Sequence, residues 1–186
     1  ADGEDAAFVP DEATHLFVSG LVFRNAENAE GNHNAAVRTD DGWRLQDCVV
    51  EDNAGGGLGI FGDDVEVCRV TAEDNGRFGM GGSGSSRLVV RDCTTRRNNL
   101  TSIMDGDGGG GKFTRLDGAL FERIEASENG GAGLWFDINN INLVVRDSTF
   151  RGNVTRRRDD GTVRATGLGL FIEISGVVVR ESDGER

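Results

Sequence analysis

One residue type recurs along the chain at nearly regular intervals, and this repeat constrains the fold more than any other feature. The recurring residues are Asn25, Asn53, Asn75, Asn98, Asn129 and Asn153. Eight residues before them stand the apolar side chains of Phe17, Leu45, Val67, Val90, Phe121 and Val145. Ten residues before them stand His15, Trp43, Val65, Leu88, Ala119 and Leu143. Because residues two apart lie on one face of a strand, the repeat predicts a short strand in each unit with this face turned inward.

The intervals between these asparagines are 28, 22, 23, 31 and 24 residues, a period typical of solenoids. We therefore predict an all-β solenoid whose parallel strands stack at about 4.8 Å. It should form about seven rungs over residues 15–182 of a single domain, residues 1–186. The first residues, Ala-Asp-Gly-Glu-Asp, do not resemble a signal peptide, and we expect a mature form or a piece of a longer protein.

Two further columns of the repeat have structural interpretations. Each asparagine is expected to lie at a bend and to hydrogen-bond the backbone and the asparagine of the next rung. Six residues before the asparagines, the charges alternate in sign along the column Asp47, Arg69, Asp92, Arg123 and Asp147. Opposite charges at facing positions of neighbouring strands attract each other, so we expect these residues to pair between rungs on the solvent-facing side of the coil.

The composition excludes several classes of partner. The formal net charge of −12 argues against non-specific binding to nucleic acid. No apolar run reaches 18 residues, so no membrane span is expected. Cys48, Cys68 and Cys93 lie in strand-like runs without a Cys-x-x-Cys spacing, which favours buried free thiols.

The motifs that accompany these columns resemble a known superfamily. They are Asp74-Asn-Gly-Arg-Phe-Gly79, Gly110-Gly-Lys-Phe113, Gly133-Leu-Trp-Phe-Asp137 and Gly169-Leu-Phe-Ile-Glu-Ile-Ser175. With the columns, they resemble the right-handed parallel β-helix repeat proteins, which include pectate lyases, alginate lyases and mannuronan epimerases. In the most similar branch a Tyr stands where this chain has Ile172. The motifs of the well-understood lyases are absent, so their catalytic residues are not carried over.

The resemblance implies a carbohydrate-active protein at the cell surface or outside the cell. Its expected partner is an acidic polysaccharide, which it would bind and, as an enzyme, would cleave by β-elimination or epimerise. A non-catalytic module that binds glycan or assembles a surface layer is the alternative, and a structural spacer is a third interpretation. Since no capping helix is evident, end-to-end self-association is also expected.

Two insertions interrupt the regular spacing of the rungs. They cover residues 99–112 and 154–166, whereas other rungs cross this corner in about five residues. Insertions in a solenoid map to loops on one face. Because these two belong to alternate rungs, we expect them to flank the rung with Trp135 and Asp137 and to form a groove there.

The alternation within Leu134-Trp-Phe-Asp137 predicts a patch of exposed side chains. If Leu134 and Phe136 fill the coil, then Trp135 and Asp137 face solvent. Phe171 and Glu173 should lie beside them one rung later, and Lys112 should lie beside Trp135 one rung earlier. Trp135 and Phe171 would be a platform for a sugar ring. In the alternative, both aromatic side chains belong to the core.

Asp137 and Glu173, stacked at strand spacing, would repel each other unless they shared a proton or a cation. A shared proton suits acid–base catalysis, and the expected cation is Ca²⁺. Asp105 and Asp107 in the glycine-rich insertion would then be further ligands, although a flexible linker is an alternative for that segment.

Lys112 is the only lysine beside 19 arginines. An ammonium can lose its proton where a guanidinium cannot, so we predict Lys112 as the base of a β-elimination, although chance alone explains one lysine equally well. Arg156, Arg157 and Arg158 in the second insertion would grip substrate carboxylates, or would be a solvated run of charge.

Overall fold

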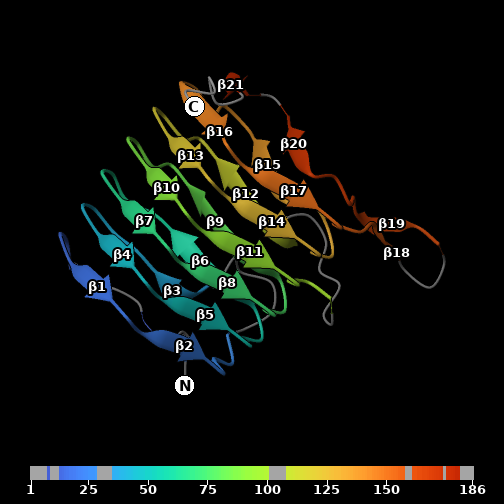
Figure 1. Cartoon of the computed structure of the whole chain (residues 1–186), viewed down its shortest axis with the longest axis horizontal. Helices are drawn as coiled ribbons and strands as arrows, with labels where there is room; N and C mark the ends of the chain where they lie inside the picture. Colours follow the sequence, from blue (N-terminus) through green and yellow to red (C-terminus); the bar gives the residue numbers. More distant parts are fainter. Residues whose placement is uncertain are drawn as a thin grey trace, which may run out of the picture.

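The computed structural model describes residue 8 and residues 13–28, 35–100, 108–157, 161–173 and 175–180, with backbone alone at 163–165 and 177–180. Every regular element in these ranges is a β-strand (Figure 1). No helix long and apolar enough to cross a membrane occurs among them.

The strands form three parallel sheets, which we number in the order that the chain visits them. The first sheet holds β1 (Phe17–Ser19), β4 (Arg44–Gln46), β7 (Glu66–Cys68), β10 (Val89–Arg91), β13 (Leu120–Glu122), β16 (Leu143–Arg146) and β21 (Val177–Arg180). The second holds β2 (Val22–Arg24), β5 (Val49–Glu51), β8 (Thr71–Glu73), β11 (Thr94–Arg96), β14 (Glu125–Ser127) and β17 (Thr149–Arg151). The third holds β3 (Ala35–Arg38), β6 (Gly56–Ile60), β9 (Phe78–Ser83), β12 (Gly109–Thr114), β15 (Leu134–Asp137) and β20 (Leu170–Ile172).

The chain therefore passes six times through all three sheets, and β21 adds a seventh strand to the first sheet. Figure 1 shows these passes as a regular stack from one end of the molecule to the other. The predicted parallel solenoid is confirmed. A short antiparallel hairpin of β18 (Arg156–Arg157) and β19 (Val163–Ala165) leaves the stack within the second insertion.

The interior of the coil is apolar and continuous. Columns from the three sheets meet there, and Leu45, Val67 and Val90 are among the side chains with at most 1% exposure. Three aromatic side chains fill the later rungs: Phe121 packs edge-on against Phe113 and Phe136, with ring centres 4.8 and 4.9 Å apart. The predicted burial of Cys48, Cys68 and Cys93 as free thiols is also confirmed. Burial raises the pKa of the Cys93 thiol to about 12.

The asparagine column forms a hydrogen-bonded ladder over five rungs. The side-chain amide of Asn53 donates to Oδ1 of Asn75 at 2.8 Å, and the same bond repeats at 3.0 Å from Asn75 to Asn98 and onward to Asn129 and Asn153. Each of these oxygens also accepts the backbone N–H of the preceding asparagine. The amide groups are thus paired in the interior, as the sequence predicted.

The prediction for the first rung was wrong by one residue. Ala26, and not Asn25, donates its N–H to Asn53 and so occupies the first ladder position. Asn25 has a φ of 60° and lies at the adjacent left-handed corner, which asparagine tolerates well. The inward side chain is consequently Val18, while Phe17 is 61% exposed. His15 likewise lies exposed at a left-handed corner (φ 56°) and not in an inward column.

Charged residues occupy many of these left-handed corners and pair between rungs. Arg69 donates from Nε and Nη2 to both carboxylate oxygens of Asp47, at 2.6 and 3.0 Å. Arg123 contacts Asp92 in the same way. The alternating column predicted from the sequence is therefore a series of inter-rung ion pairs.

The two ends of the coil differ in how they are covered. At the first rung the Phe8 ring packs against Phe23 and Trp43, with centres 5.8 and 5.5 Å apart. Leu21 near that end and Ile172 in the last rung remain 48% and 38% exposed. End-to-end self-association stays a prediction.

Candidate binding site on the third sheet

The third sheet carries one outward column that contains the predicted patch. Its residues are in register in the order Arg38, Gly59, Gly81, Lys112, Trp135 and Phe171. Leu134 and Phe136 are 2% and 0% exposed in the core. Trp135, between them in the strand, therefore faces outward and is half-buried by its neighbours. The outward direction of Trp135 agrees with the prediction. Asp137, predicted to face solvent, is buried at 7% exposure, where it contacts Lys112.

Lys112 makes two close contacts in this patch. Its Nζ lies 2.9 Å from Oδ2 of Asp137 and 3.6 Å from the centre of the Trp135 ring. The side chains of Lys112 and Asp137 are only 21% and 10% exposed. A carboxylate and an aromatic face both attract a charged ammonium, so Lys112 connects Asp137 to the Trp135 ring.

Trp135 and Phe171 stack on each other on the outer side of β15 and β20. Their ring centres are 5.2 Å apart and the ring planes are inclined by 28°. The indole Nε1 is buried and has no hydrogen-bond partner. Together the two rings form a half-exposed aromatic surface with Lys112 against its other side.

Glu173 follows the register of the sheet, since its N–H donates to the Phe136 carbonyl at 2.8 Å and so sets it beside Asp137. The sequence predicted Ca²⁺ between these two carboxylates. Oδ2 of Asp137 instead faces the Lys112 ammonium, and the described part of the chain contains no cluster of three potential metal ligands. The predicted Ca²⁺ site stays a prediction, because two of its four predicted ligands are not described. Asp105 and Asp107 lie outside the described residues.

Hydroxyl groups continue the Asp137 column toward the earlier rungs. Thr114 is in register with Asp137, and Ser83 with Thr114. The Thr114 hydroxyl donates to Ser83 Oγ at 2.8 Å, and Arg115 Nη1 donates to the same oxygen at 3.3 Å. The edge of the patch thus offers polar groups suited to sugar hydroxyls.

The arginines of the second insertion are only partly described. Arg156 Nη2 donates to the Leu100 carbonyl at 2.7 Å and so joins the bases of the two insertions. Arg157 donates to Gly161 inside the hairpin at 2.9 Å. Arg158 lies outside the described residues. Substrate binding by these arginines and the predicted groove stay predictions.

A second cation lies on an aromatic ring at the other end of the same column. The guanidinium carbon of Arg38 is 4.7 Å from the centre of the Phe61 ring. Both side chains pack over Gly59, where an added Cβ would lie 2.9 Å from Phe61 Cε2 and 3.5 Å from Arg38 Cγ. Sequence reasoning missed this pair. The signal was present, because extending the Lys112 column back by three rungs reaches Arg38.

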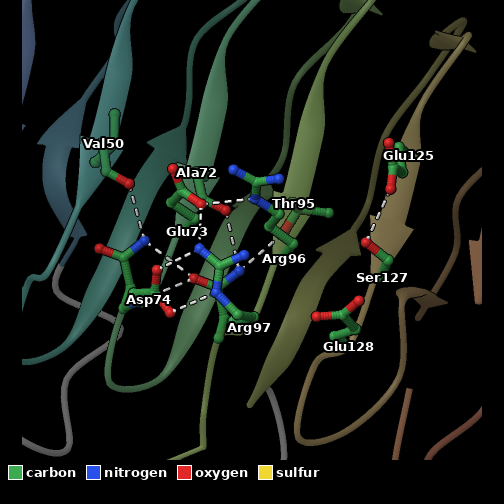
Figure 2. A network of polar contacts seen from close by, with 12 residues as sticks. Val50, Ala72, Glu73, Asp74, Thr95, Arg96, Arg97, Glu125, Ser127 and Glu128 are labelled. Carbon is green, nitrogen blue, oxygen red and sulfur yellow. Dashed lines mark hydrogen bonds and ion pairs between the residues drawn. The ribbon is translucent and has the colours of Figure 1, made fainter. Parts of the chain in front are cut away.

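Ten of the described arginines elsewhere on the coil are paired with carboxylates. Ion pairs involve Arg24, Arg44, Arg69, Arg87, Arg91, Arg96, Arg97, Arg123, Arg146 and Arg151, which lie on the first two sheets and their corners. Figure 2 shows one such network, in which Arg96 and Arg97 both contact Glu73 and Arg97 also contacts Asp74.

The third sheet differs from the other two in this respect. Among the described residues, no carboxylate lies within ion-pair distance of Arg38 or Arg115. Acidic residues outnumber basic ones by 32 to 20 in this chain. Arg38 and Arg115 thus give the outer side of the third sheet and its corner positive charge that no described carboxylate neutralises.

Comparison with known proteins agrees with this architecture. Residues 19–183 match the family model described as the right-handed beta helix region. The chain is also similar to the crystal structure of pectate lyase Pel9A, with a TM-score of 0.60 and 19% identity over 80% of this chain. It spans 38% of the length of that chain, and at this identity the similarity establishes the fold alone. No curated protein sequence matches. Because the family model covers most of its residues, the chain belongs to the right-handed β-helix family.

Proposed function

We propose that the protein binds an acidic polysaccharide on the outer face of its third sheet, at the cell surface or outside the cell. The observation that carries the proposal is the stacked pair of Trp135 and Phe171, half-exposed beside Lys112 and Asp137. Lys112 and Phe171 cover the two faces of the Trp135 ring, so the apolar C–H groups of a sugar would pack against the exposed parts of the two aromatic side chains. The sugar hydroxyls would bond to polar groups at the rim. Ser83 and Thr114 supply such groups.

The charge distribution supports an anionic glycan over a neutral one. The chain as a whole repels polyanions through its net charge of −12. Arg38 and Arg115 project from the third sheet and its corner without a described acidic partner. A uronic acid polymer bound there would pair its carboxylates with these guanidinium groups. The similarity to a pectate lyase, an enzyme named for a polymer of this class, agrees with the proposal.

Cleavage of the polymer by β-elimination is the second candidate function. Lys112 would abstract the proton beside a uronate carboxylate, and Arg115 would stabilise the negative charge that develops. Lys112 lies against the aromatic platform, where a bound sugar would be within its reach. A base must first be neutral, however, and both contacts of Lys112 attract the ammonium. The geometry therefore supports binding better than catalysis. Epimerisation would need the same neutral base, so the geometry supports it no better than cleavage.

Calorimetric titration with polygalacturonate and with alginate tests the binding proposal. We expect Trp135→Ala to weaken binding at least tenfold, since a central aromatic contact contributes about 2 kcal/mol. Phe17→Ala is the matched control, because Phe17 is an exposed aromatic on the first sheet. Equal affinity of the wild type and Trp135→Ala would contradict the proposed site, and no binding to either polymer would favour a structural spacer.

Ultraviolet absorbance of the same mixtures tests the second candidate. Unsaturated ends formed by β-elimination absorb, so a rising signal that disappears in Lys112→Ala would establish a lyase with Lys112 as its base. A rise that persists in Lys112→Ala would assign the base to another residue.

A further inference from the structure

We propose that Arg38, supported by Phe61, is a second anion-binding position, and that the glycan lies along the axis of the coil from β15 toward β3. This inference rests on the proposed function, since it extends the ligand from Trp135 across the same sheet. It assigns a ligand contact to a side chain three rungs away from Lys112 in the same outward column.

The first argument is the repetition of one arrangement at two places. Lys112 lies over Trp135 and Arg38 lies over Phe61, and each cation is half-buried on its ring. Packing on a ring limits the motion of a long side chain, so less conformational entropy is lost when it binds a ligand. Lys112 is already neutralised by Asp137, whereas Arg38 has no such partner among the described residues.

The second argument is the surface between the two cations. Gly59 and Gly81 occupy the two intervening positions of the column and add no side chain of their own. The Phe61 ring packs over Gly59. The space above Gly81 is partly filled by the Phe78 ring, which an added Cβ would meet at 3.4 Å. Phe61, Phe78 and backbone therefore line the column between the two cations.

The third argument concerns the nearest acid. Asp40 follows Arg38 by two residues, but its Oδ1 accepts the Asp41 N–H at 2.8 Å and makes no ion pair with Arg38. Asp40 would nevertheless repel a bound carboxylate. Its removal should therefore strengthen binding, a result that a misfolded variant could not produce.

The geometry makes the contribution of Arg38 depend on ligand length. Three rung steps separate Arg38 from Lys112, which corresponds to about 14 Å at the usual strand spacing. A short oligouronate held by Trp135 cannot reach Arg38, and only a longer one contacts both positions. Loss of Arg38 should consequently weaken the binding of long oligomers alone.

Calorimetry with short and long oligomers of the uronic acid polymer that binds the wild type tests this inference. We expect Arg38→Gln to lower the affinity for the long oligomer roughly fivefold to tenfold and to leave the affinity for the short one unchanged. Arg38→Lys should retain part of the affinity, and Asp40→Asn should increase it about twofold. Arg24→Gln is the control of equal charge, since Arg24 ends β2 on the second sheet and is 62% exposed.

The outcomes separate this inference from the proposed function. If Trp135→Ala weakens both oligomers while Arg38→Gln and Asp40→Asn match the wild type, the second position is wrong and the proposed function stands. Equal losses in Arg38→Gln and Arg24→Gln would also overturn it, because they would reflect net charge alone. If Trp135→Ala has no effect, the proposed function itself fails.

Discussion

The ammonium of Lys112 lies 3.6 Å above the centre of the Trp135 ring. The two residues lie in register on adjacent rungs, Lys112 in β12 and Trp135 in β15. The same nitrogen is 2.9 Å from Asp137, two residues beyond Trp135 on the strand. One cation thus contacts both the aromatic platform and the carboxylate, so replacing Lys112 should affect Trp135 and Asp137 as well.

Removing Lys112 should therefore destabilise the fold as well as the site. In Lys112→Met the Asp137 carboxylate stays largely buried without its partner, and we expect a loss of about 1–2 kcal/mol in the free energy of unfolding. Urea denaturation measures it. Arg44→Gln is the control, because its contact with Glu66 is exposed and long at 3.8 Å. A double-mutant cycle with Asp137→Asn should give a coupling energy above zero, and additive effects would contradict the pairing.

The asparagine ladder should contribute most to stability at its centre. Asn98 accepts the N–H and the side-chain amide of Asn75 and donates to the Ala72 carbonyl. Asn98→Ala leaves these buried groups unpaired, at a cost of about 2–4 kcal/mol. Asn153→Ala, at the end of the ladder, should cost less. Thermal unfolding of both variants measures the difference, and equal losses would show that the ladder does not act as a connected unit.

The inter-rung pairs predict the response of stability to acid. Hydrogen bonds from arginine lower the pKa of Asp47, Asp64 and Asp92 below the ordinary value of 3.8. The contribution of these carboxylates to the free energy of unfolding is complete above their unfolded-state pKa. It is lost as the pH falls through their lower folded-state pKa. The melting temperature should be flat near neutral pH and should fall below about pH 4. Replacing all three residues with asparagine should make that fall shallower, and an unchanged profile would count against these pairs.

Calcium should not be required for glycan binding. Lys112 already neutralises Asp137, so a divalent cation is not needed to hold that carboxylate. Titrations in the presence of a chelator and of added Ca²⁺ should give the same affinity. A calcium-dependent increase that is lost in Asp105→Asn and Asp107→Asn would show that these residues complete a site with Asp137 and Glu173.

Much of the fold followed from the sequence because a solenoid repeats the same positions. The ladder from Asn53 to Asn153 and the alignment of Lys112, Trp135 and Phe171 required only the repeat and the alternation of a strand. The first rung failed because asparagine suits both a ladder position and a left-handed corner, and Asn25 occupies the corner.

The contacts between side chains were less accessible to sequence reasoning. Lys112 pairs with Asp137 diagonally across two strands, and this choice depends on side-chain rotamers that no column of residues records. The register alone favours a pairing of Asp137 with Glu173 through a cation. Arg38 and Phe61 were missed because Gly59 and Gly81 interrupt the column and conceal its continuation.

A fluorescence titration of a protein with Trp135 as its single tryptophan tests the central claim most directly. Trp43, the other tryptophan, is fully buried in the core and is replaced in Trp43→Phe. If the glycan packs against the exposed part of Trp135, adding polygalacturonate or alginate should shift its emission in a saturable way, with the affinity found by calorimetry. Saturable binding by calorimetry without any change in Trp135 emission would place the ligand elsewhere and contradict the account.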